Sequence, residues 1–336
     1  MAKKQFKAES KRLLDLMINS IYTHKEIFLR EIISNSSDAI DKLCYLSLTD
    51  DKVGMDRGDF RIRVRADRDA GTITVSDNGI GMDKEGLEQN LGVIARSGSF
   101  QFKNEVGEDA QKADLDVIGQ FGVGFYSAFM VSDRVTVLTR AYGSDTAYKW
   151  ECSGADGYTV TESEREGVGT DVIMHIKPDT EDEKYSEYLN TWKLQELVKK
   201  YSDYVRGPIV MYVEHYEMTE TGEKDENGAP KTEYVTETRE ETVNSMVHIW
   251  QRSKSDVSDE DCKKFYKEKF YDSEEPLAVI RVSAEGTVSY KAMLFIPAKA
   301  PYDFYTRDYK PGLQLYSSGV MIMDKCSDLL PDCFRF

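Results

Sequence analysis

The sequence is poor in the residues that build disulfide frameworks and zinc sites. Its five cysteines are odd in number and show no C-x-x-C spacing, so neither a disulfide scaffold nor a structural zinc site is indicated. The four histidines also lack the spacing of metal ligands. These absences favour a reducing compartment, and the cytoplasm is the simplest location.

Long apolar runs and excess positive charge are missing as well. No segment approaches the roughly 18 consecutive apolar residues of a membrane span. The first 22 residues carry Glu9 and Asp15 and no continuous apolar stretch, which argues against a secretory signal or a transit peptide. Lysine and arginine number 44 against 60 acidic residues, a formal charge of −16. Because such a surface repels nucleic acid and anionic lipid, we expect neither as a partner.

The sequence also contains no G-x-x-x-x-G-K-[ST] motif, which excludes a P-loop enzyme. The chain has 336 residues, a length typical of about two domains. Its composition, 40% hydrophobic and 31% charged, is typical of a globular protein. The acidic balance still permits nucleotide binding, because that needs only a local site and usually a magnesium ion.

Hydrophobic periodicity predicts the order of the elements. Helices are expected at 6–22, 25–46, 83–91, 125–131, 192–204 and 259–270. Strands are expected at 61–66, 72–76, 134–140, 147–151, 158–162, 170–177, 209–214, 277–282, 288–296 and 313–323, the last interrupted by Ser317-Ser318-Gly319. Residues 92–118 form a long segment without periodicity, typical of a functional lid or of disorder. Residues 219–242 hold eight acidic and three basic residues, which indicates a charged linker or a long exposed hairpin.

One polar stripe lies on the second expected helix. Glu31, Asn35 and Asp38 stand at i, i+4 and i+7, which puts them within about 40° of one another around the helix axis. A carboxylate and an amide at the rim of a pocket could activate a water and ligate a metal ion. The alternative is an ordinary polar edge of a helix.

A second motif follows the strand 72–76, in the order Asp77-Asn78-Gly79-Ile80-Gly81-Met82. A carboxylate at a strand end can accept a hydrogen bond from an exocyclic amine, while the glycines leave room for a flat ring. The alternatives are an Asx turn closed by glycine and a methionine that only fills the core.

Two further segments suit a phosphate chain. Ile118 to Phe125 places three glycines within six residues before a helix, where free N–H groups and the helix dipole favour an anion. Residues 90–98 offer a polar side chain, Asn90, and a cation, Arg96, although they also fit a helix end capped by Gly92. Gly169-Thr170, at the start of a strand, is weak evidence by itself.

The order of these motifs resembles the nucleotide site shared by gyrase B, histidine kinases, MutL and the heat shock protein 90 chaperones. Longer strings narrow the resemblance to the chaperones, namely residues 25–35, 90–98 and 119–127. Residues 243–336 are similar to the middle domain of that family, above all at 294–297 and 321–324. The resemblance covers essentially the whole chain, and bacterial members are the nearest.

This resemblance implies an α+β chain. Residues 1–216 would be an N-terminal ATP-binding domain, a two-layer α/β sandwich, with a lid at about 92–124. Residues 217–242 would be a charged linker, and 243–336 an α/β middle-domain fragment. The implied function is that of an ATP-dependent chaperone of the stress response, which binds unfolded client proteins.

The resemblance also implies roles for residues. Glu31 would be the general base for water, Asn35 would hold Mg²⁺, Asp77 would bind the adenine amino group and Thr170 would assist through water. The other residues implied to contact ATP or ADP are Asp38, Lys42, Gly79, Gly81, Met82, Asn90, Leu91, Arg96, Ser97, Gly98, Gln120, Phe121, Gly122, Val123, Gly124 and Phe125.

Two departures from the family pattern set further expectations. The family has a catalytic arginine beyond position 336 and dimerises through a C-terminal domain, so we expect this chain to hydrolyse ATP slowly and to be a monomer. The apolar end at Phe336 suggests a fragment. Two other interpretations stay open: a MutL-, gyrase- or kinase-like ATPase of the same fold, and a nucleotide-binding module without turnover.

Overall fold

The computed structural model describes residues 24–94, 96, 98–99, 118–119, 122–154, 157–224, 230–253 and 255–331. Of residues 216–224 and 230–235 it describes the backbone alone. The chain divides into two compact units, Met1–Asn244 and Ser245–Phe336. Across the described parts of both units, no helix combines the length and the apolarity needed to cross a bilayer.

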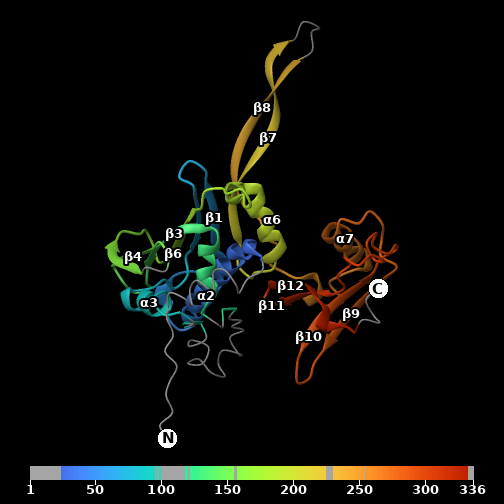
Figure 1. The fold of residues 1–336 in the computed structure, drawn as a ribbon, viewed down its shortest axis with the longest axis horizontal. Coiled ribbons are helices and arrows are strands. Elements are labelled where there is room, and N and C mark those ends of the chain that lie inside the picture. The colour runs from blue at the N-terminus through green and yellow to red at the C-terminus, as the bar shows by residue number, and fades with distance from the viewer. Residues whose placement is uncertain are drawn as a thin grey trace. The chain divides into compact units, whose positions relative to one another are not determined.

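The first unit is a mixed sheet with helices packed on it (Figure 1). Its strands run in the order β5-β4-β3-β6-β2-β1-β7-β8, and β1 pairs in parallel with β7 while the other neighbours are antiparallel. The strands are β1 (Ile62–Asp67), β2 (Thr72–Asp77), β3 (Ser132–Arg140), β4 (Ala147–Cys152), β5 (Tyr158–Ser163), β6 (Gly169–Ile176), β7 (Ile209–Lys224) and β8 (Pro230–Thr242).

The helices of this unit are α2 (Phe28–Ser47), α3 (Lys84–Asn90) and α6 (Thr191–Tyr201). Single 3-10 turns occur at Lys25–Ile27, Asp51–Val53, Arg57–Asp59 and Tyr185–Leu189, and a longer 3-10 helix, η5, at Gly124–Met130. The turn chemistry agrees with the sequence: Asp83 caps α3 by accepting a hydrogen bond from the Gly86 N–H, and Asn190 caps α6 in the same way through Trp192.

Helix α2 lies on β1, β2 and β6, because its apolar residues recur at helical intervals. Phe28, Ile32 and Leu43 are at most 1% exposed. On the sheet, alternating residues such as Ile73 and Val75 are fully buried. This pairing builds the core of the unit and holds one face of α2 at the end of β2.

The acidic segment forms a hairpin. Strands β7 and β8 pair from Val210↔Thr242 out to Lys224↔Pro230, so the main-chain hydrogen bonds order a stretch whose side chains have little to bury. Of the two interpretations left open by the sequence, linker and exposed hairpin, the structure has the hairpin. It projects from the sheet in Figure 1.

The second unit packs α7 (Asp259–Phe270) on the hairpin of β9 (Ala278–Ala284) and β10 (Tyr290–Ile296). Phe265, Tyr266 and Phe270 all contact the ring of Phe295, which gives this unit an aromatic core. A second hairpin joins β11 (Leu313–Ser317) to β12 (Val320–Cys326), and 3-10 turns occur at Ile249–Gln251 and Ser327–Leu329.

The expected elements within the described residues are present, with two differences. The interruption expected at Ser317-Ser318-Gly319 is present as a turn between two strands, because Ser318 and Gly319 take positive φ. The helical run after the glycine loop is a 3-10 helix. The strand expected at 209–214 continues to Lys224. The helix expected at 6–22 and most of the expected lid lie outside the described residues.

Candidate functional site

Helix α2 presents the polar stripe with three different degrees of exposure. The Glu31 side chain is 21% exposed, Asn35 is exposed and Asp38 is 1% exposed. The stripe therefore runs across the border of the apolar face, as its spacing predicts, and ends inside the core. A simple solvated helix edge would not bury Asp38.

The Glu31 carboxylate lies between Arg30 and the glycine loop. Its Oε1 atom accepts hydrogen bonds from Nε and Nη2 of Arg30, at 3.0 and 2.5 Å. Its Oε2 atom lies 2.5 Å from the position that a Cβ on Gly124 would occupy. Glycine at 124 is therefore what lets the carboxylate reach the start of η5.

Asp38 binds the segment just before the glycine loop. Its two carboxylate oxygens accept hydrogen bonds from the N–H groups of Ile118 and Gly119, at 2.8 and 2.9 Å. Burial raises the pKa of Asp38, and these two bonds and the nearby Lys42 oppose that rise. Burial lowers the pKa of Lys42, which the charge of Asp38 opposes. Asp38 and Lys42 therefore interact at the foot of the loop, where burial disfavours the charged form of each.

Gly119 lies next to two of the three polar side chains of the stripe, Asn35 and Asp38. A Cβ at this position would lie 3.0 Å from Oδ2 of Asp38 and 3.4 Å from Oδ1 of Asn35. The backbone at 118–119 thus comes as close to α2 as a residue without a side chain allows. This contact joins the expected metal ligand to the expected phosphate loop.

Asp77 ends β2 with a buried carboxylate, 5% exposed. It accepts a hydrogen bond from the Gly79 N–H at 2.9 Å and another from the hydroxyl of Ser36 on α2. Burial raises its pKa to about 7, against these two bonds. The Asx turn that the sequence left open is therefore present, but its carboxylate is held in the interior next to α2.

The two glycines after Asp77 permit close backbone contacts. A Cβ on Gly79 would lie 2.5 to 2.7 Å from backbone atoms of Ala39 and Ile40 in α2. Gly81 has φ +66°, and a Cβ there would overlap the carbonyl of Arg140. The chain from 77 to 82 is thereby held between α2 and the end of β3.

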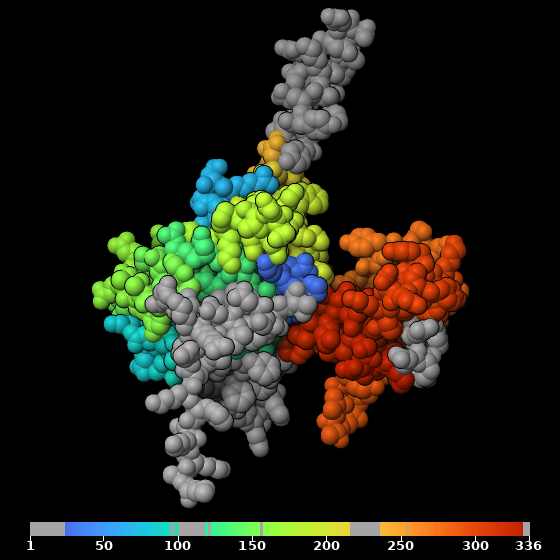
Figure 2. Space-filling view, viewed as in Figure 1, coloured from blue at the N-terminus to red at the C-terminus, as the bar shows by residue number. Residues whose placement is uncertain are grey.

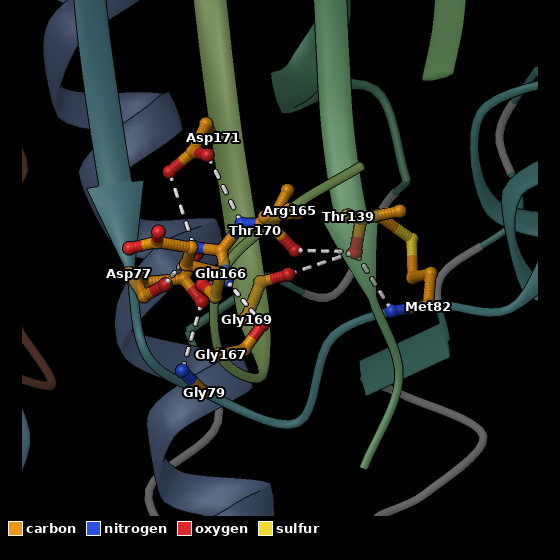
Figure 3. A network of polar contacts seen from close by, with 10 residues as sticks. All are labelled: Asp77, Gly79, Met82, Thr139, Arg165, Glu166, Gly167, Gly169, Thr170 and Asp171. Atoms are coloured by element: carbon orange, nitrogen blue, oxygen red, sulfur yellow. Dashed lines mark hydrogen bonds and ion pairs between the residues drawn. The ribbon is translucent and has the colours of Figure 1, made fainter. Parts of the chain in front are cut away.

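A hydroxyl relay connects Met82 with the start of β6 (Figure 3). The Thr139 hydroxyl accepts from the Met82 N–H at 2.9 Å and donates to the Gly169 carbonyl at 3.0 Å. Because Thr139 has only one proton, Thr170 is the donor in their mutual contact at 3.0 Å. The lone pairs of the Thr170 hydroxyl are then oriented away from Thr139.

The other two segments lie against one another. Gly122 has φ +65° and packs so closely on the backbone of Arg96 that a Cβ would overlap it. A Cβ on Gly98 would lie 2.5 Å from Oδ1 of Asn90. The Tyr126 hydroxyl donates to the Leu91 carbonyl at 3.0 Å. The two ends of the expected lid therefore meet beside α2 and β4.

A neighbouring contact holds the end of α3. The Tyr158 hydroxyl of β5 fills the space where Gly92 would carry a Cβ, and its ring stacks on Trp150. Figure 2 shows the corresponding surface, with α3 (cyan) beside β4 and β5 (green). Arg96, expected near phosphates, donates a hydrogen bond to Gln89 at 3.1 Å.

The structure thus brings together most of the expected site. Three of its residues lie on α2 beside the glycine loop: Glu31 at Gly124, and Asn35 and Asp38 at Gly119. Asp77 binds Ser36 of the same helix. Thr170 is connected to them by its hydrogen bond with Thr139 and by its pairing with β2. Val123 and Phe125 flank Gly124 at the start of η5. Ser97, Gln120 and Phe121 lie outside the described residues.

Four contributing residues were not expected from the sequence, namely Arg30, Ser36, Thr139 and Arg165. Arg30 and Ser36 stand beside motif residues on α2, which is a signal that could have been followed. Thr139 and Arg165 act through strand pairing between distant segments, so no local pattern marks them.

The donor set suits a divalent cation only together with a nucleotide. In the parts of the chain that the structure describes, no three His, Cys, Asp or Glu side chains gather in a metal-binding group. An Asn35 amide oxygen next to the Gly119 backbone fits Mg²⁺, which takes one or two protein oxygens and completes its shell with phosphate and water.

Comparison with protein families gives two matches. Residues 22–167 match the family described as histidine kinase-, DNA gyrase B-, and HSP90-like ATPase. Residues 214–336 match the family described as Hsp90 protein. The first unit is accordingly an ATPase domain of the type shared by those proteins, a mixed eight-stranded sheet with helices, followed by a further α/β region.

Curated relatives agree along the whole chain. The chain is 56% identical over 336 residues to a chaperone protein HtpG of Clostridium botulinum (strain 657 / Type Ba4) and to one of Alkaliphilus metalliredigens. It is 55% identical over the same length to a chaperone protein HtpG of Bacillus subtilis. All of this chain is covered in each case, and 52% of the relative, so the chain spans about half the length of the curated relatives it matches.

Proposed function

The chain belongs to the heat shock protein 90 family, and on that premise we propose that it binds ATP and ADP with Mg²⁺ and hydrolyses ATP. The observation that carries the proposal is the convergence on α2. One helix contacts the start of the glycine loop through Asp38 and the end of that loop through Glu31. The same helix contacts the Asp77 turn through Ser36 and Ala39. A nucleotide needs both ends of such a site, one for phosphate and one for the base.

Each end has a chemical role in this proposal. Asp77 accepts a hydrogen bond from the adenine amino group, and Thr170 assists through a water. Gly79, Gly81 and Met82 shape the slot for the ring, and Asn90 with the backbone of 119–125 holds ribose and phosphates. A buried carboxylate discriminates strongly between an amine and a carbonyl, so adenine is favoured over guanine.

Hydrolysis falls to Glu31, which reaches the start of η5, where the phosphate chain would end. As a general base it orients and deprotonates the attacking water. Asn35 would hold Mg²⁺, which when bound offsets the negative charge of the phosphates. Both hydrogen bonds from Arg30 end on Oε1 of Glu31, so Glu31 must leave Arg30 at least in part before that oxygen can bind the water.

We further propose, from the family, that nucleotide binding serves the handling of unfolded client proteins by the longer protein. We keep the proposed division of the chain into three parts. These are an ATP-binding domain at 1–216, a charged linker at 217–242 and part of a middle domain at 243–336. Phosphate release from ATP tests the expected slow turnover, and sedimentation tests the expected monomeric state.

Calorimetry with ADP and Mg²⁺ tests the nucleotide site. We expect saturable binding by the parent chain and loss of most binding in Asp77→Asn, because an amide places a donor where an acceptor is needed. Equal affinities of parent and variant, or no binding by either, would contradict the proposal. GDP serves as the matched control ligand.

One observation favours a second candidate, a nucleotide-binding module without turnover. Arg30 occupies Oε1 of Glu31 with two hydrogen bonds, so the proposed base is paired in this structure. Release of phosphate from ATP, compared between the parent and Glu31→Ala, separates the two. A rate that does not change on substitution would favour the module.

A further inference from the structure

Arg165 lies in the turn between β5 and β6, and its side chain is 9% exposed. A buried arginine requires many partners, because the guanidinium is always charged and carries five N–H groups. In this chain it has five acceptors, and Figure 3 shows it at the end of β2.

The five acceptors come from three pieces of the chain. Nε and Nη2 donate to the two carboxylate oxygens of Asp171 on β6, at 3.0 and 3.1 Å, in the bidentate geometry of strong ion pairs. Nη1 donates to the carbonyls of Glu166 and Gly167 in the turn, at 3.3 and 2.9 Å. Nη2 also donates to the carbonyl of Asp77 at the end of β2, at 3.0 Å.

This arrangement holds the two residues proposed to bind the base. Asp77 and Thr170 are directly opposite in the β2–β6 ladder. Gly169, with φ +125°, packs against the Asp77 carbonyl so closely that a Cβ there would overlap it. The Asp77 carbonyl is therefore held between the guanidinium and Gly169, and a shift of Arg165 moves Asp77 and Thr170 relative to one another.

We propose that Arg165 is a positioning residue of the nucleotide site, which sets the spacing of Asp77 and Thr170 and thereby the affinity and selectivity for adenine. The inference rests on the proposed nucleotide function. Arg165 does not touch the base; it acts through the main chain of Asp77 and of the turn before Thr170. Lysine cannot replace it in this role, because an ammonium has three donors and no planar fork.

The same contacts tie Arg165 to the ionisation of Asp77. The charged groups that face Asp77 are Arg165 from the turn, which lowers its pKa, and Asp171 from β6, which raises it. From α2 the facing group is the uncharged hydroxyl of Ser36, and from the turn after β2 it is the Gly79 N–H. Substitutions at 165 and 171 therefore shift the pH dependence of binding in opposite directions.

The test is calorimetry of the parent chain and of Arg165→Gln, Arg165→Lys and Asp171→Asn with Mg²⁺-ADP and Mg²⁺-GDP between pH 5.5 and 8.5. Titration of the phosphates is common to all four proteins, so differences between them report on the protein. We expect Arg165→Gln to lose about tenfold or more in ADP affinity, because the carbonyl of the buried Asp77 and the Asp171 carboxylate lose their charged donor, and to lose part of its preference for ADP over GDP.

The pH profile separates positioning from general damage to the fold. The pH midpoint of the change in ADP affinity should move up in Arg165→Gln and down in Asp171→Asn. Arg165→Lys keeps the charge, so it should lose affinity while its midpoint stays near that of the parent. Arg63→Gln is the matched control, since Arg63 also forms an ion pair on this sheet, with Glu240 at 2.8 Å. It should bind as the parent does.

Three results would overturn the inference. The first is an Arg165→Gln variant with the ADP affinity and base preference of the parent. The second is a variant with lower ADP affinity but with the pH midpoint and base preference of the parent. If Arg165→Gln does not fold, as judged by thermal denaturation, parental behaviour of both Arg165→Lys and Asp171→Asn would decide against it. Absence of ADP binding by the parent would instead remove the proposed function, and the inference with it.

Discussion

Oε2 of Glu31 and the α-carbon of Gly124 are in such close contact that a methyl group on Gly124 would lie 2.5 Å from the carboxylate. The two residues come from α2 and from the start of η5, almost a hundred positions apart. The proposed base and the end of the proposed phosphate loop are therefore packed against one another, and the loop constrains where the carboxylate can go.

This contact predicts that Gly124→Ala lowers ATP hydrolysis at least tenfold with little change in thermal stability. The atom that the new methyl meets is the end of a flexible side chain, so the carboxylate moves and the backbone does not. Phosphate release and the melting temperature check the two halves of this prediction.

Gly122→Ala is the matched comparison, because Gly122 has φ +65° and its Cβ would meet the backbone of Arg96. It should lose both stability and ADP affinity, since backbone at positive φ costs a residue with a Cβ about 1 kcal/mol or more. If the two variants behaved alike, the contact between Glu31 and Gly124 would have no special role.

Glu31→Ala should abolish the hydrolysis of ATP and leave the affinity for ADP within about threefold of the parent. The carboxylate is placed to act on water, and no base or ribose contact is assigned to it. Single-turnover phosphate release and calorimetry measure the two effects. A large loss of ADP affinity would show that Glu31 serves binding instead of the chemical step.

Asp77→Asn should stabilise the unliganded protein at high pH even as it removes nucleotide binding. The folded state raises the pKa of Asp77 from 3.8 to about 7, so it disfavours the ionised carboxylate. Below pH 4 the folded and unfolded states are both protonated and there is no penalty. Between pH 4 and 7 the unfolded state ionises first, and stability falls as the pH rises.

Above pH 7 the loss of folding stability caused by ionised Asp77 is constant, and asparagine avoids this loss because it does not ionise. At about 1.4 kcal/mol per pKa unit, Asp77→Asn should gain on the order of 4 kcal/mol at pH 8 and clearly less at pH 5. Urea unfolding of both proteins at the two pH values measures the difference. A variant that is less stable than the parent at pH 8 would indicate a carboxylate stabilised by its hydrogen bonds.

Removal of magnesium should weaken ADP binding in the parent and have little effect in Asn35→Ala. The Asn35 amide oxygen lies beside the position of a Cβ on Gly119, at 3.4 Å, and no other role is proposed for it. Calorimetry with Mg²⁺ and with a chelator gives the comparison for both proteins. An equal response to the chelator in the variant would place the metal on other ligands.

Local sequence patterns are enough for most of the elements. Alternation of apolar residues such as Ile62 and Val64 predicts β1, and the helix expected at 259–270 is α7. The Asp77 turn and the glycine loop were also evident, because glycine and Asx chemistry act within a few residues.

Other features depend on contacts that no short segment encodes. The type of the helix after the glycine loop and the extension of β7 to Lys224 both differ from the local prediction. The sheet places β6 between β3 and β2, which puts Thr170 opposite Asp77 on one side and opposite Thr139 on the other. Strand order of this kind is decided by packing over the whole unit.

By itself, the sequence determined the family to which the motifs belong, and it predicted which residues bind a nucleotide, because the motifs are local and their order along the chain is specific. Only the tertiary structure decided that Arg30 pairs with Glu31, that Asp38 binds the backbone at 118–119, and that Arg165 joins β2 to β6. The reason is that burial and strand pairing assign partners to charged groups, and both arise only when distant segments pack together.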